Sequence, residues 1–249
     1  MLAEEVKPYD KARPKGEQVE AMFDSIAPAY DMMNTAMTFG MHRHWLKKSL
    51  KALTSTIDNS ENISILDLAT GTGDVAFSLA KLFPNASITG VDLSEGMLRI
   101  AGDKLLETHN EDSGRIKFQQ GDCLNLSFED SSFNLLSIAY GIRNFENLQK
   151  GFREFYRVLK EGGKCLILEL SRPENKMVRA GYDLYSRSLI PFLGRIMSKD
   201  SRAYRYLPES IAAMPPRHKI EEMLKAAGFR KIVSKPLTLG VVTYFIAEK

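Results

Sequence analysis

Between residues 63 and 170, short apolar runs typical of strands alternate with longer stretches of helical periodicity, and this order is the strongest constraint on the fold. The strand-like runs are ISILDLA, SITGVDL, IKFQQGD, FNLLSIAY and KCLILEL. Helical patterns separate them, for example from Asp74 to Leu82 and near residues 147 to 159. Consecutive parallel strands need a long crossover, which a helix normally supplies. The sequence therefore predicts a doubly wound α/β fold with a mostly parallel sheet.

The last segment of the chain changes this pattern. HKIEEMLKAAGF has a helical periodicity that Gly228 would end, and two β-rich runs follow it, KIVSKPLT and VVTYFIAEK. Only the short Leu239-Gly240 turn joins these two runs, and so short a connection cannot make a crossover. We therefore expect the last strand to run antiparallel at the end of a seven-stranded sheet. Ligands of such sheets bind beyond the carboxyl ends of the strands, where the strand order reverses.

The chain has 249 residues and is expected to form a single domain over residues 17–249, after a polar, flexible tail over 1–16. The domain divides by its sequence patterns into consecutive segments. They are an N-terminal helical segment that forms a lid (17–53), a cofactor-binding core (63–170), an insertion that faces substrate or membrane (176–215), and a C-terminal helix with two strands (217–249). Pro28 and Gly40 break the helical periodicity of the first segment.

Composition excludes several classes of protein. The 34 basic and 31 acidic side chains nearly balance, which gives no reason to expect nucleic acid as a partner. No apolar run approaches the roughly 18 residues of a membrane span, and the polar first residues are unlike a signal peptide. Cys123 and Cys165 lie far apart, and His42 and His44 would point away from each other on a helix, so we expect neither a metal site nor a disulfide. These features favour a cytoplasmic protein.

A glycine-rich turn links the first strand to the helix after it, in the segment SILDLATGTGDVAFSLA. Gly71, Gly73 and Ala76 fit the G-x-G-x-x-[G/A] pattern of dinucleotide sites. Asp92 follows at the end of the second strand, where an acid would hold a ribose. A nicotinamide or flavin dinucleotide is therefore one candidate ligand, and a tight turn without a ligand is another interpretation.

Carboxylates around this turn favour a cationic ligand instead. Asp67 lies in the first strand and Asp74 begins the helix, so two negative charges would flank a bound diphosphate with no Lys or Arg near in sequence. S-adenosylmethionine has a sulfonium, an ammonium and no phosphate, and Asp92 would bind its ribose hydroxyls. Asp122 ends the third strand, where it would meet the adenine amino group. We therefore predict an S-adenosylmethionine site.

Several stretches of the chain resemble known methyltransferases. LDLATGTGD, GVDLSEGML, the GD at 121–122 and RVLKEGGKCLILELSRP are similar to motifs of class I S-adenosylmethionine-dependent methyltransferases. YDMMNTAMTFGMHRHWLKKSL, AYGIRNFEN and YRYLPESI resemble the quinol C-methyltransferases of menaquinone and ubiquinone biosynthesis, over a region from about residue 17 to the end. Together with the turn, the resemblance implies that the cofactor contacts are Asp67, Gly71, Thr72, Gly73, Asp92, Leu93, Asp122, Cys123 and Ala139.

The chain departs from this family at two places. Family members often have a serine where Ala139 stands, so one cofactor hydrogen bond is expected to be missing or to come from backbone. After YLPESI the chain has AAMPPRHK, where the family often has an acidic or amide residue after a proline. The substrate contacts of that stretch therefore stay open.

The resemblance implies methyl transfer to a ring carbon of a polyprenylated quinol, with demethylmenaquinol as the expected substrate and a methoxy-benzoquinol of ubiquinone synthesis as the alternative. A quinol carbon becomes nucleophilic when a neighbouring hydroxyl loses its proton, so the site needs a group that faces the phenolate. Arg143 and Asn144 follow the fourth strand and are the candidates, while Tyr140 would donate to the other hydroxyl. A surface Arg143 paired with Glu146, or a packed Tyr140, is the alternative for these residues. A dinucleotide-dependent oxidoreductase and a non-catalytic cofactor-binding protein are the alternatives for the whole chain.

Basic and apolar residues interleave between residues 176 and 205. The basic members are Lys176, Arg179, Arg187, Arg195, Lys199, Arg202 and Arg205. Such a stretch would line a channel for a polyprenyl tail and contact an anionic membrane surface, at the inner face of the membrane. An ordinary amphipathic helix with solvated charges is the alternative. The sequence makes no prediction of oligomeric state.

Overall fold

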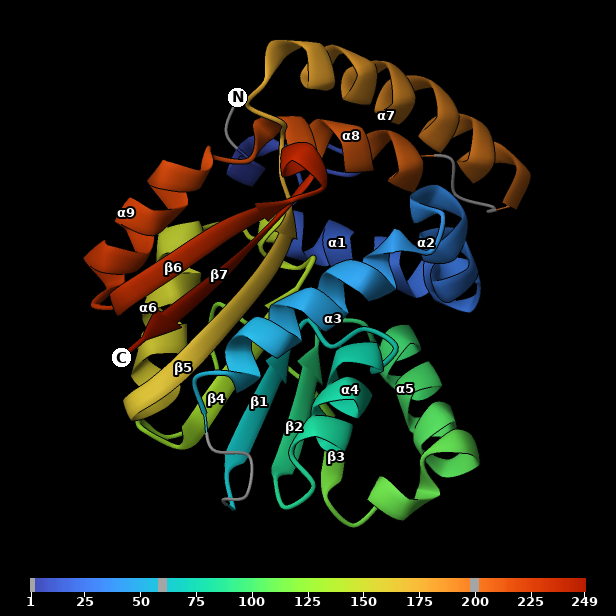
Figure 1. Ribbon diagram of the computed structural model, residues 1–249. Coiled ribbons are helices and arrows are strands. Elements are labelled where there is room, and N and C mark those ends of the chain that lie inside the picture. Colours follow the sequence, from blue (N-terminus) through green and yellow to red (C-terminus); the bar gives the residue numbers. More distant parts are fainter. Residues whose placement is uncertain (1–2, 58–61, 198–201) are drawn as a thin grey trace.

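The computed structural model describes residues 3–57, 62–197 and 202–249, apart from the side chains of residues 187 and 189–197. Within these ranges, seven strands form one sheet in the order β3-β2-β1-β4-β5-β7-β6 (Figure 1). The strands are β1 (Ser64–Leu68), β2 (Ser87–Asp92), β3 (Ile116–Gln120), β4 (Phe133–Ala139), β5 (Leu159–Leu170), β6 (Arg230–Leu237) and β7 (Val242–Glu248). β7 pairs antiparallel with β5 and β6, and the other pairs are parallel. The predicted doubly wound sheet with an antiparallel end is confirmed.

The strand order reverses at β1, which pairs with β2 on one side and with β4 on the other. Leu68 at the end of β1 is in register with Val91 of β2 and Ile138 of β4. The residues that follow each of these three positions therefore meet at one edge of the sheet. Asp92 and Ala139 are two of them, and the glycine-rich turn begins there.

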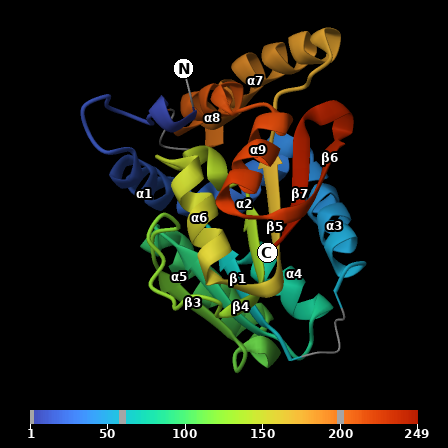
Figure 2. The same cartoon turned by 90° about the vertical axis from the view of Figure 1, so that its left-hand side faces the viewer.

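Helices cover both faces of the sheet (Figure 2). The covering helices are α3 (Met41–Thr54), α4 (Asp74–Leu82), α5 (Glu95–Thr108), α6 (Leu148–Val158) and α9 (Arg217–Ala227). α6 and α9 pack on one face through Phe152, Phe155 and Leu224, all fully buried. α3 and α4 pack on the other face through Leu53 and Leu79, which are also fully buried. Each such side chain contributes about 1.5–3 kcal/mol to the stability of the fold by leaving water. These contacts hold the helices on the two faces of the sheet.

A third layer, which we call the cap layer, lies beyond the carboxyl ends of the strands (Figure 1). Its helices are α1 (Lys15–Ile26), α2 (Tyr30–Thr38), α7 (Lys176–Met197) and α8 (Ala203–Ala213). They pack through an apolar cluster of their own that includes Met22, Met33 and Tyr206. The break between α1 and α2 contains Pro28, and the break between α2 and α3 contains Gly40 with a φ of +74°, as predicted.

Residues 3–14 differ from the flexible tail expected of them. Ala3 is buried, and Lys15 at the start of α1 is only 1% exposed. The Lys15 ammonium donates hydrogen bonds to the carbonyl oxygens of Ala3 at 2.7 Å, Arg143 at 3.0 Å and Phe145 at 3.1 Å. Because a buried ammonium requires acceptors, these bonds hold the N-terminal segment against the turn that follows β4.

Candidate active site

The turn after β1 brings backbone atoms close to the ligand-binding edge of the sheet. Gly71 and Gly73 have φ angles of +56° and +87°, a region that favours glycine. A Cβ at Gly73 would lie 2.7 Å from the ring of Phe77, so this position also lacks space for a side chain. The Gly71 amide donates to the Asp92 carboxylate at 2.8 Å, and this bond ties the turn to the end of β2.

Asp92 is a buried carboxylate that two backbone amides hold in place. Oδ2 accepts a hydrogen bond from Gly71, and Oδ1 accepts one from the amide of Ser94 at 2.9 Å. Burial raises the pKa of Asp92 above its ordinary value, and the amide hydrogen bonds oppose that rise. A carboxylate has about four lone-pair sites, so Asp92 can accept further bonds from a ligand's hydroxyls.

A cavity of about 320 Å³ opens beside Asp92, and we call it the acidic cavity. Predicted cofactor residues that line it are Gly71, Asp92, Leu93, Asp122, Cys123 and Ala139. Phe23 of α1 and Tyr30 of α2 close it from the cap layer. Its lining includes the carboxylates of Glu17, Glu20, Asp92, Asp122 and Glu146, and no lysine or arginine among the described residues. This excess of negative charge favours a cationic ligand over a diphosphate.

Asp67, another predicted cofactor residue, lies outside the acidic cavity. It is 1% exposed beneath the turn, where its carboxylate accepts hydrogen bonds from the hydroxyls of Thr70 and Ser137, each at 2.6 Å. Burial raises the pKa of Asp67 to about 7. Asp67 therefore supports the turn from below. Gly73 also lies outside this cavity, which Gly71 lines.

Thr72 lies outside the acidic cavity as well, in a group of charges on the other side of the turn. Its hydroxyl donates to Asp31 at 2.7 Å, and Lys104 of α5 forms ion pairs with Asp31 at 2.6 Å and Asp74 at 2.8 Å. No Lys or Arg lies near Asp74 in sequence, but the fold brings Lys104 to it from 30 residues away. The preference for a cationic ligand rests on the lining of the acidic cavity instead.

The turn after β4 carries the residues predicted to be catalytic. Tyr140 has a φ of +59°, and a short 3-10 helix, η4 (Ile142–Asn144), follows it. The Arg143 guanidinium is buried, and its Nη1 donates to Glu169 Oε1 at 2.8 Å and to the Tyr140 carbonyl. Glu169 also accepts the backbone N–H of Arg143 at 3.2 Å. The structure thus contradicts the alternative of a surface Arg143 paired with Glu146.

Sequence reasoning missed Glu169, the ion-pair partner of Arg143. Glu169 lies in the apolar run LILEL of β5 and is 2% exposed. A carboxylate inside a central strand needs a partner, because an unpaired buried charge costs several kcal/mol or more. The isolated acid in that run was the available signal, although it does not identify the partner.

A second cavity of about 310 Å³, the aromatic cavity, lies on the other side of Tyr140. Tyr30 and Tyr140 line both cavities, so the two spaces meet at this pair. Most other walls are apolar or aromatic and include Met37, Trp45, Leu170, Tyr182, Ile211 and Val241. Arg143 also lines this cavity, and among the described residues its Nε and the Tyr140 hydroxyl have no hydrogen-bond partner. An apolar chamber with two uncommitted donors suits an apolar ring that carries oxygen atoms.

Asn144 lines the acidic cavity rather than the aromatic one. Its Oδ1 accepts a hydrogen bond from the hydroxyl of Tyr206 at 3.0 Å. Tyr206 is buried and comes from the YRYLPESI stretch on α8. That stretch therefore fixes the side chain of Asn144 from the cap layer.

The fold and the site define the class I S-adenosylmethionine-dependent methyltransferase architecture. One solved structure with this fold is Haemonchus contortus phosphoethanolamine N-methyltransferase 2 in complex with S-adenosylhomocysteine, with a TM-score of 0.61, 20% identity, and coverage of 82% of this chain and 52% of that chain. The [4+2]-cyclase SpnF is also similar, with a TM-score of 0.68, 17% identity, and coverage of 95% and 97%. Identities this low show the fold alone, and the presence of a cyclase means that the fold does not decide the reaction.

The chain belongs to the ubiE/COQ5 methyltransferase family, which matches residues 11–249. It is 44% identical to the demethylmenaquinone methyltransferase of Porphyromonas gingivalis, over 99% of this chain and 98% of that protein. It is 39% identical to the ubiquinone/menaquinone biosynthesis C-methyltransferase UbiE of Geotalea daltonii, over 96% of this chain and 99% of that protein. The predicted S-adenosylmethionine-dependent C-methyltransferase is confirmed, and the dinucleotide-dependent oxidoreductase and the non-catalytic binding protein are set aside.

Proposed function

We propose that this chain transfers the methyl group of S-adenosylmethionine to a ring carbon of a polyprenylated quinol, and that the quinol is demethylmenaquinol. The observation that carries this proposal is the meeting of the acidic and aromatic cavities at Tyr30 and Tyr140. The acidic cavity suits a cationic cofactor, and the aromatic cavity suits an apolar ring that carries oxygen atoms. The naming of several relatives as demethylmenaquinone methyltransferases supports this choice of substrate.

The donor set of the acidic cavity fits S-adenosylmethionine, which supplies an electrophilic methyl group. Asp92 binds the ribose hydroxyls, and Asp122 meets the adenine amino group at the next strand end. Cys123 is buried, and burial raises the pKa of its thiol, so it packs against the cofactor as a neutral group. Gly71 and Ala139 leave room for the cofactor to approach the backbone.

Arg143 stabilises the charge that develops on the quinol. A ring carbon would attack the methyl group once a neighbouring hydroxyl has lost its proton to water, and the resulting phenolate needs a donor. The S–CH3 bond would break as the C–CH3 bond forms, which leaves S-adenosylhomocysteine, and the proton on the ring carbon would then pass to water and restore aromaticity. Burial disfavours the guanidinium charge, but Glu169, together with Tyr30 and Tyr206, raises the pKa of Arg143. Arg143 therefore stays protonated, and its Nε–H, which has no partner among the described residues, would donate to the phenolate oxygen. Burial also raises the pKa of Tyr140, which keeps its hydroxyl as a donor for the other oxygen.

The redox state of the acceptor tests this mechanism. The quinone's carbonyls withdraw density from the ring, so an oxidised acceptor cannot attack a methyl sulfonium, whereas the quinol's hydroxyls donate density. We expect methyl transfer to a demethylmenaquinone analogue only after reduction, measured anaerobically with and without dithionite or borohydride. Equal rates in the two arms would require the mechanism to be withdrawn.

The choice between quinols is tested by a comparison of acceptors. A methoxy-benzoquinol of ubiquinone synthesis is the alternative substrate, and the relative from Geotalea daltonii is named for both pathways. We expect kcat/KM for demethylmenaquinol to exceed that for the methoxy-benzoquinol at equal tail length. The reverse order would reassign the substrate while leaving C-methyl transfer in place.

The cap layer is the part of the protein that would rest on the membrane in which such a substrate is dissolved, at its cytoplasmic face. Phe39 and Met41 line the aromatic cavity and are 76% and 38% exposed, so apolar side chains surround its mouth. Among the described residues, no helix is both long and apolar enough to cross a membrane. Of the basic residues predicted to face the membrane, Lys199 lies outside the described residues, as do the side chains of Arg187 and Arg195.

Phe39→Ser tests this membrane contact. The variant is expected to bind phospholipid vesicles less and to lose activity on a long-tailed quinol while retaining it on a short-tailed analogue. Leu106→Ser is the matched control, because Leu106 is 66% exposed on α5 and lines neither cavity. Identical vesicle binding by both variants and the wild type would remove Phe39 from the contact.

A further inference from the structure

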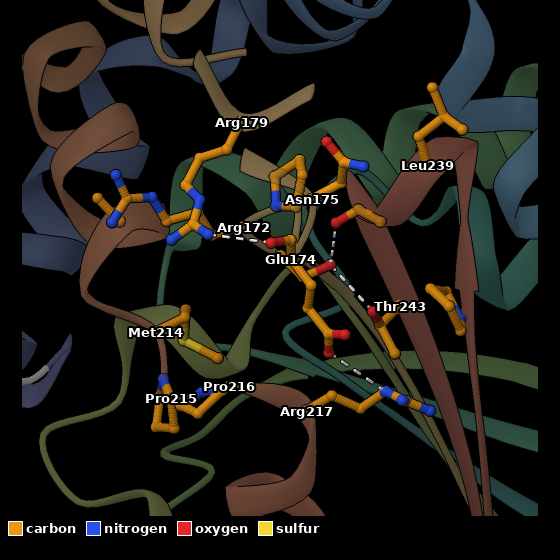
Figure 3. A pocket seen from close by; sticks show the side chains of 15 residues that line it. Arg172, Glu174, Asn175, Arg179, Met214, Pro215, Pro216, Arg217, Leu239 and Thr243 are labelled. Atoms are coloured by element: carbon orange, nitrogen blue, oxygen red, sulfur yellow. Dashed lines mark hydrogen bonds and ion pairs between the residues drawn. The ribbon is translucent and has the colours of Figure 1, made fainter. Parts of the chain in front are cut away.

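A third cavity, of about 490 Å³, lies behind the end of β5 and shares no lining residue with the acidic or aromatic cavities. Its lining comes from residues 171–175 after β5, residues 214–217 before and at the start of α9, and the β6–β7 hairpin (Figure 3). Arg179 of α7 and Ala212 of α8 complete it. Its basic residues are Arg172, Arg179 and Arg217, and we call it the arginine cavity. The reaction proposed above uses none of these three side chains.

Within the part of the chain that the structure describes, most hydrogen-bond donors of these arginines have no partner. Arg172 pairs with Asp183 at 2.8 Å through Nη2, and Arg179 donates from Nη2 to the backbone carbonyl of Glu174 at 3.0 Å. Arg217 donates from Nη1 to Ser234 at 3.3 Å and places Nε 3.8 Å from Glu174 Oε1. Because each guanidinium has five N–H donors, every one of them can still bind an anion.

Glu174 is the one carboxylate that lines the arginine cavity among the described residues. Figure 3 shows Glu174 between Arg179 on one side and Arg217 on the other. Its side chain is 74% exposed, and its contact with Arg217 is long, so this carboxylate can swing out into solvent. Arg217 faces this displaceable carboxylate and Arg179 binds the backbone carbonyl of the same residue, so an incoming anion would meet two guanidinium groups there.

The start of α9 adds to this positive potential. Arg217 is the first residue of this eleven-residue helix, Pro216 precedes it, and no side chain caps its first amides. The N-terminus of α7 differs, because Asn175 Oδ1 already accepts from the amides of Met177 at 2.9 Å and Val178 at 3.3 Å. The uncapped amides of α9 therefore favour a bound anion at the edge of the arginine cavity.

Apolar side chains make up much of the remaining wall, beside the polar Ser171, Asn175 and Thr243. Met214, Pro215, Pro236 and Leu239 line it, and Leu239 is 76% exposed beside the opening. Inorganic phosphate alone would leave most of this volume unfilled, whereas a phosphorylated ligand with an apolar portion would occupy both kinds of wall. We propose that the arginine cavity binds a phosphate-bearing ligand, with the phosphoryl group between Arg179 and Arg217 in place of the Glu174 carboxylate. The phosphate comes either from a phospholipid headgroup or from a soluble phosphorylated compound.

Calorimetric titration with pyrophosphate tests the shared phosphate chemistry. S-adenosylhomocysteine is kept saturating, so that the acidic cavity is filled throughout. We expect the double variant R179Q/R217Q to bind pyrophosphate at least about tenfold more weakly than the wild type. E174Q should bind it more tightly, because the competing carboxylate is removed. Arg153→Gln, an exposed arginine of α6 that lines none of these cavities, is the control and should match the wild type.

Vesicles distinguish the two sources of the phosphate. If the ligand is a lipid headgroup, vesicles with phosphatidylglycerol bind the wild type more tightly than R179Q/R217Q, while pure phosphatidylcholine vesicles do not discriminate between them. If the ligand is soluble, pyrophosphate binding alone depends on the two arginines. Circular dichroism and the rate of methyl transfer to a soluble, short-tailed quinol, which should be unchanged, show that the variants fold. Binding of both probes that is indifferent to R179Q/R217Q and E174Q would overturn the proposal.

Discussion

Three buried carboxylates in this protein are stabilised by three different kinds of partner. Asp67 accepts hydrogen bonds from two hydroxyls, Asp92 accepts from two backbone amides, and Glu169 pairs with a guanidinium. Burial raises the pKa of Asp67 to about 7, and the hydrogen bonds from the two hydroxyls oppose that rise. The pairing of Glu169 with Arg143 instead keeps a positive charge at the site.

Asp67 makes the stability of the fold depend on pH. Its pKa rises from 3.8 in the unfolded chain to about 7 in the folded one, so the stabilising contribution is full below 3.8 and is lost as pH rises through about 7. Asp67→Asn does not titrate. Between about pH 4 and pH 8 the wild type should therefore lose about 1–4 kcal/mol relative to the variant. Urea unfolding of both proteins at the two pH values measures this difference, and a constant difference would mean that Asp67 has an ordinary pKa.

Glu169 is expected to act as a positioning residue for Arg143. Glu169→Gln keeps the shape of the side chain and removes the charge that holds the guanidinium. We expect kcat to fall about tenfold, less than the roughly hundredfold loss expected for Arg143→Leu. Affinity for S-adenosylhomocysteine, measured by calorimetry, should not change. If the double variant loses no more than R143L alone, the two residues act as one unit, whereas additive losses would separate their roles.

At the scale of elements, the short helix η4 is where the cap layer and the sheet are joined. Lys15 reaches the carbonyls of Arg143 and Phe145 from α1, and Tyr206 reaches Asn144 from α8. Each contact is made by a side chain that is buried. The loop that carries the proposed catalytic groups is thus held from both sides, which limits the motion of Arg143.

Lys15→Met tests the role of the N-terminal segment in that support. The change removes three hydrogen bonds and leaves buried carbonyls without a donor, so we expect a loss of about 2–4 kcal/mol in the free energy of unfolding and a lower kcat. Lys7→Met is the matched control, since Lys7 donates to two carbonyls in the same segment but is exposed. Equal stability of the two variants in urea would show that the buried contacts of Lys15 contribute little.

At the scale of the whole molecule, the cap layer has a core separate from the two faces of the sheet. It closes the acidic cavity through Phe23 and Tyr30, which belong to α1 and α2. The strand ends provide Asp92, Asp122 and the glycine-rich turn, and the cap layer covers the cavity and adds Glu17 and Glu20. Cofactor binding should therefore stabilise the cap layer more than the helices on the faces of the sheet.

Hydrogen exchange followed by mass spectrometry checks this expectation. Addition of S-adenosylhomocysteine should slow amide exchange in α1 and in the turn at 69–73, because both line the acidic cavity. Exchange in α6 and α9 should change little, since they pack on the sheet away from it. Uniform slowing across all helices would instead indicate that the ligand stabilises the protein only against global unfolding.

The amino-acid sequence by itself determined the order of strands and helices, the antiparallel end and the glycine-rich turn. These features follow from local periodicity and from connection lengths, which act over a few residues and leave a visible pattern. The same reasoning placed Asp92 and Asp122 at one edge, because neighbouring parallel strands end on the same side. The candidate Ala139 came from the family resemblance instead.

The tertiary structure alone decided which charges meet. Glu169 reaches Arg143 from 26 residues away, Lys104 reaches Asp74 from 30, and Lys15 reaches Arg143 from 128. These pairings depend on how helices pack over the sheet, and no local pattern records that packing. For the same reason, only the structure shows that Asp67 lies beneath the turn and accepts hydrogen bonds from Thr70 and Ser137. Buried groups take whichever partners the packing brings within reach, since leaving them unpaired costs more than any local preference.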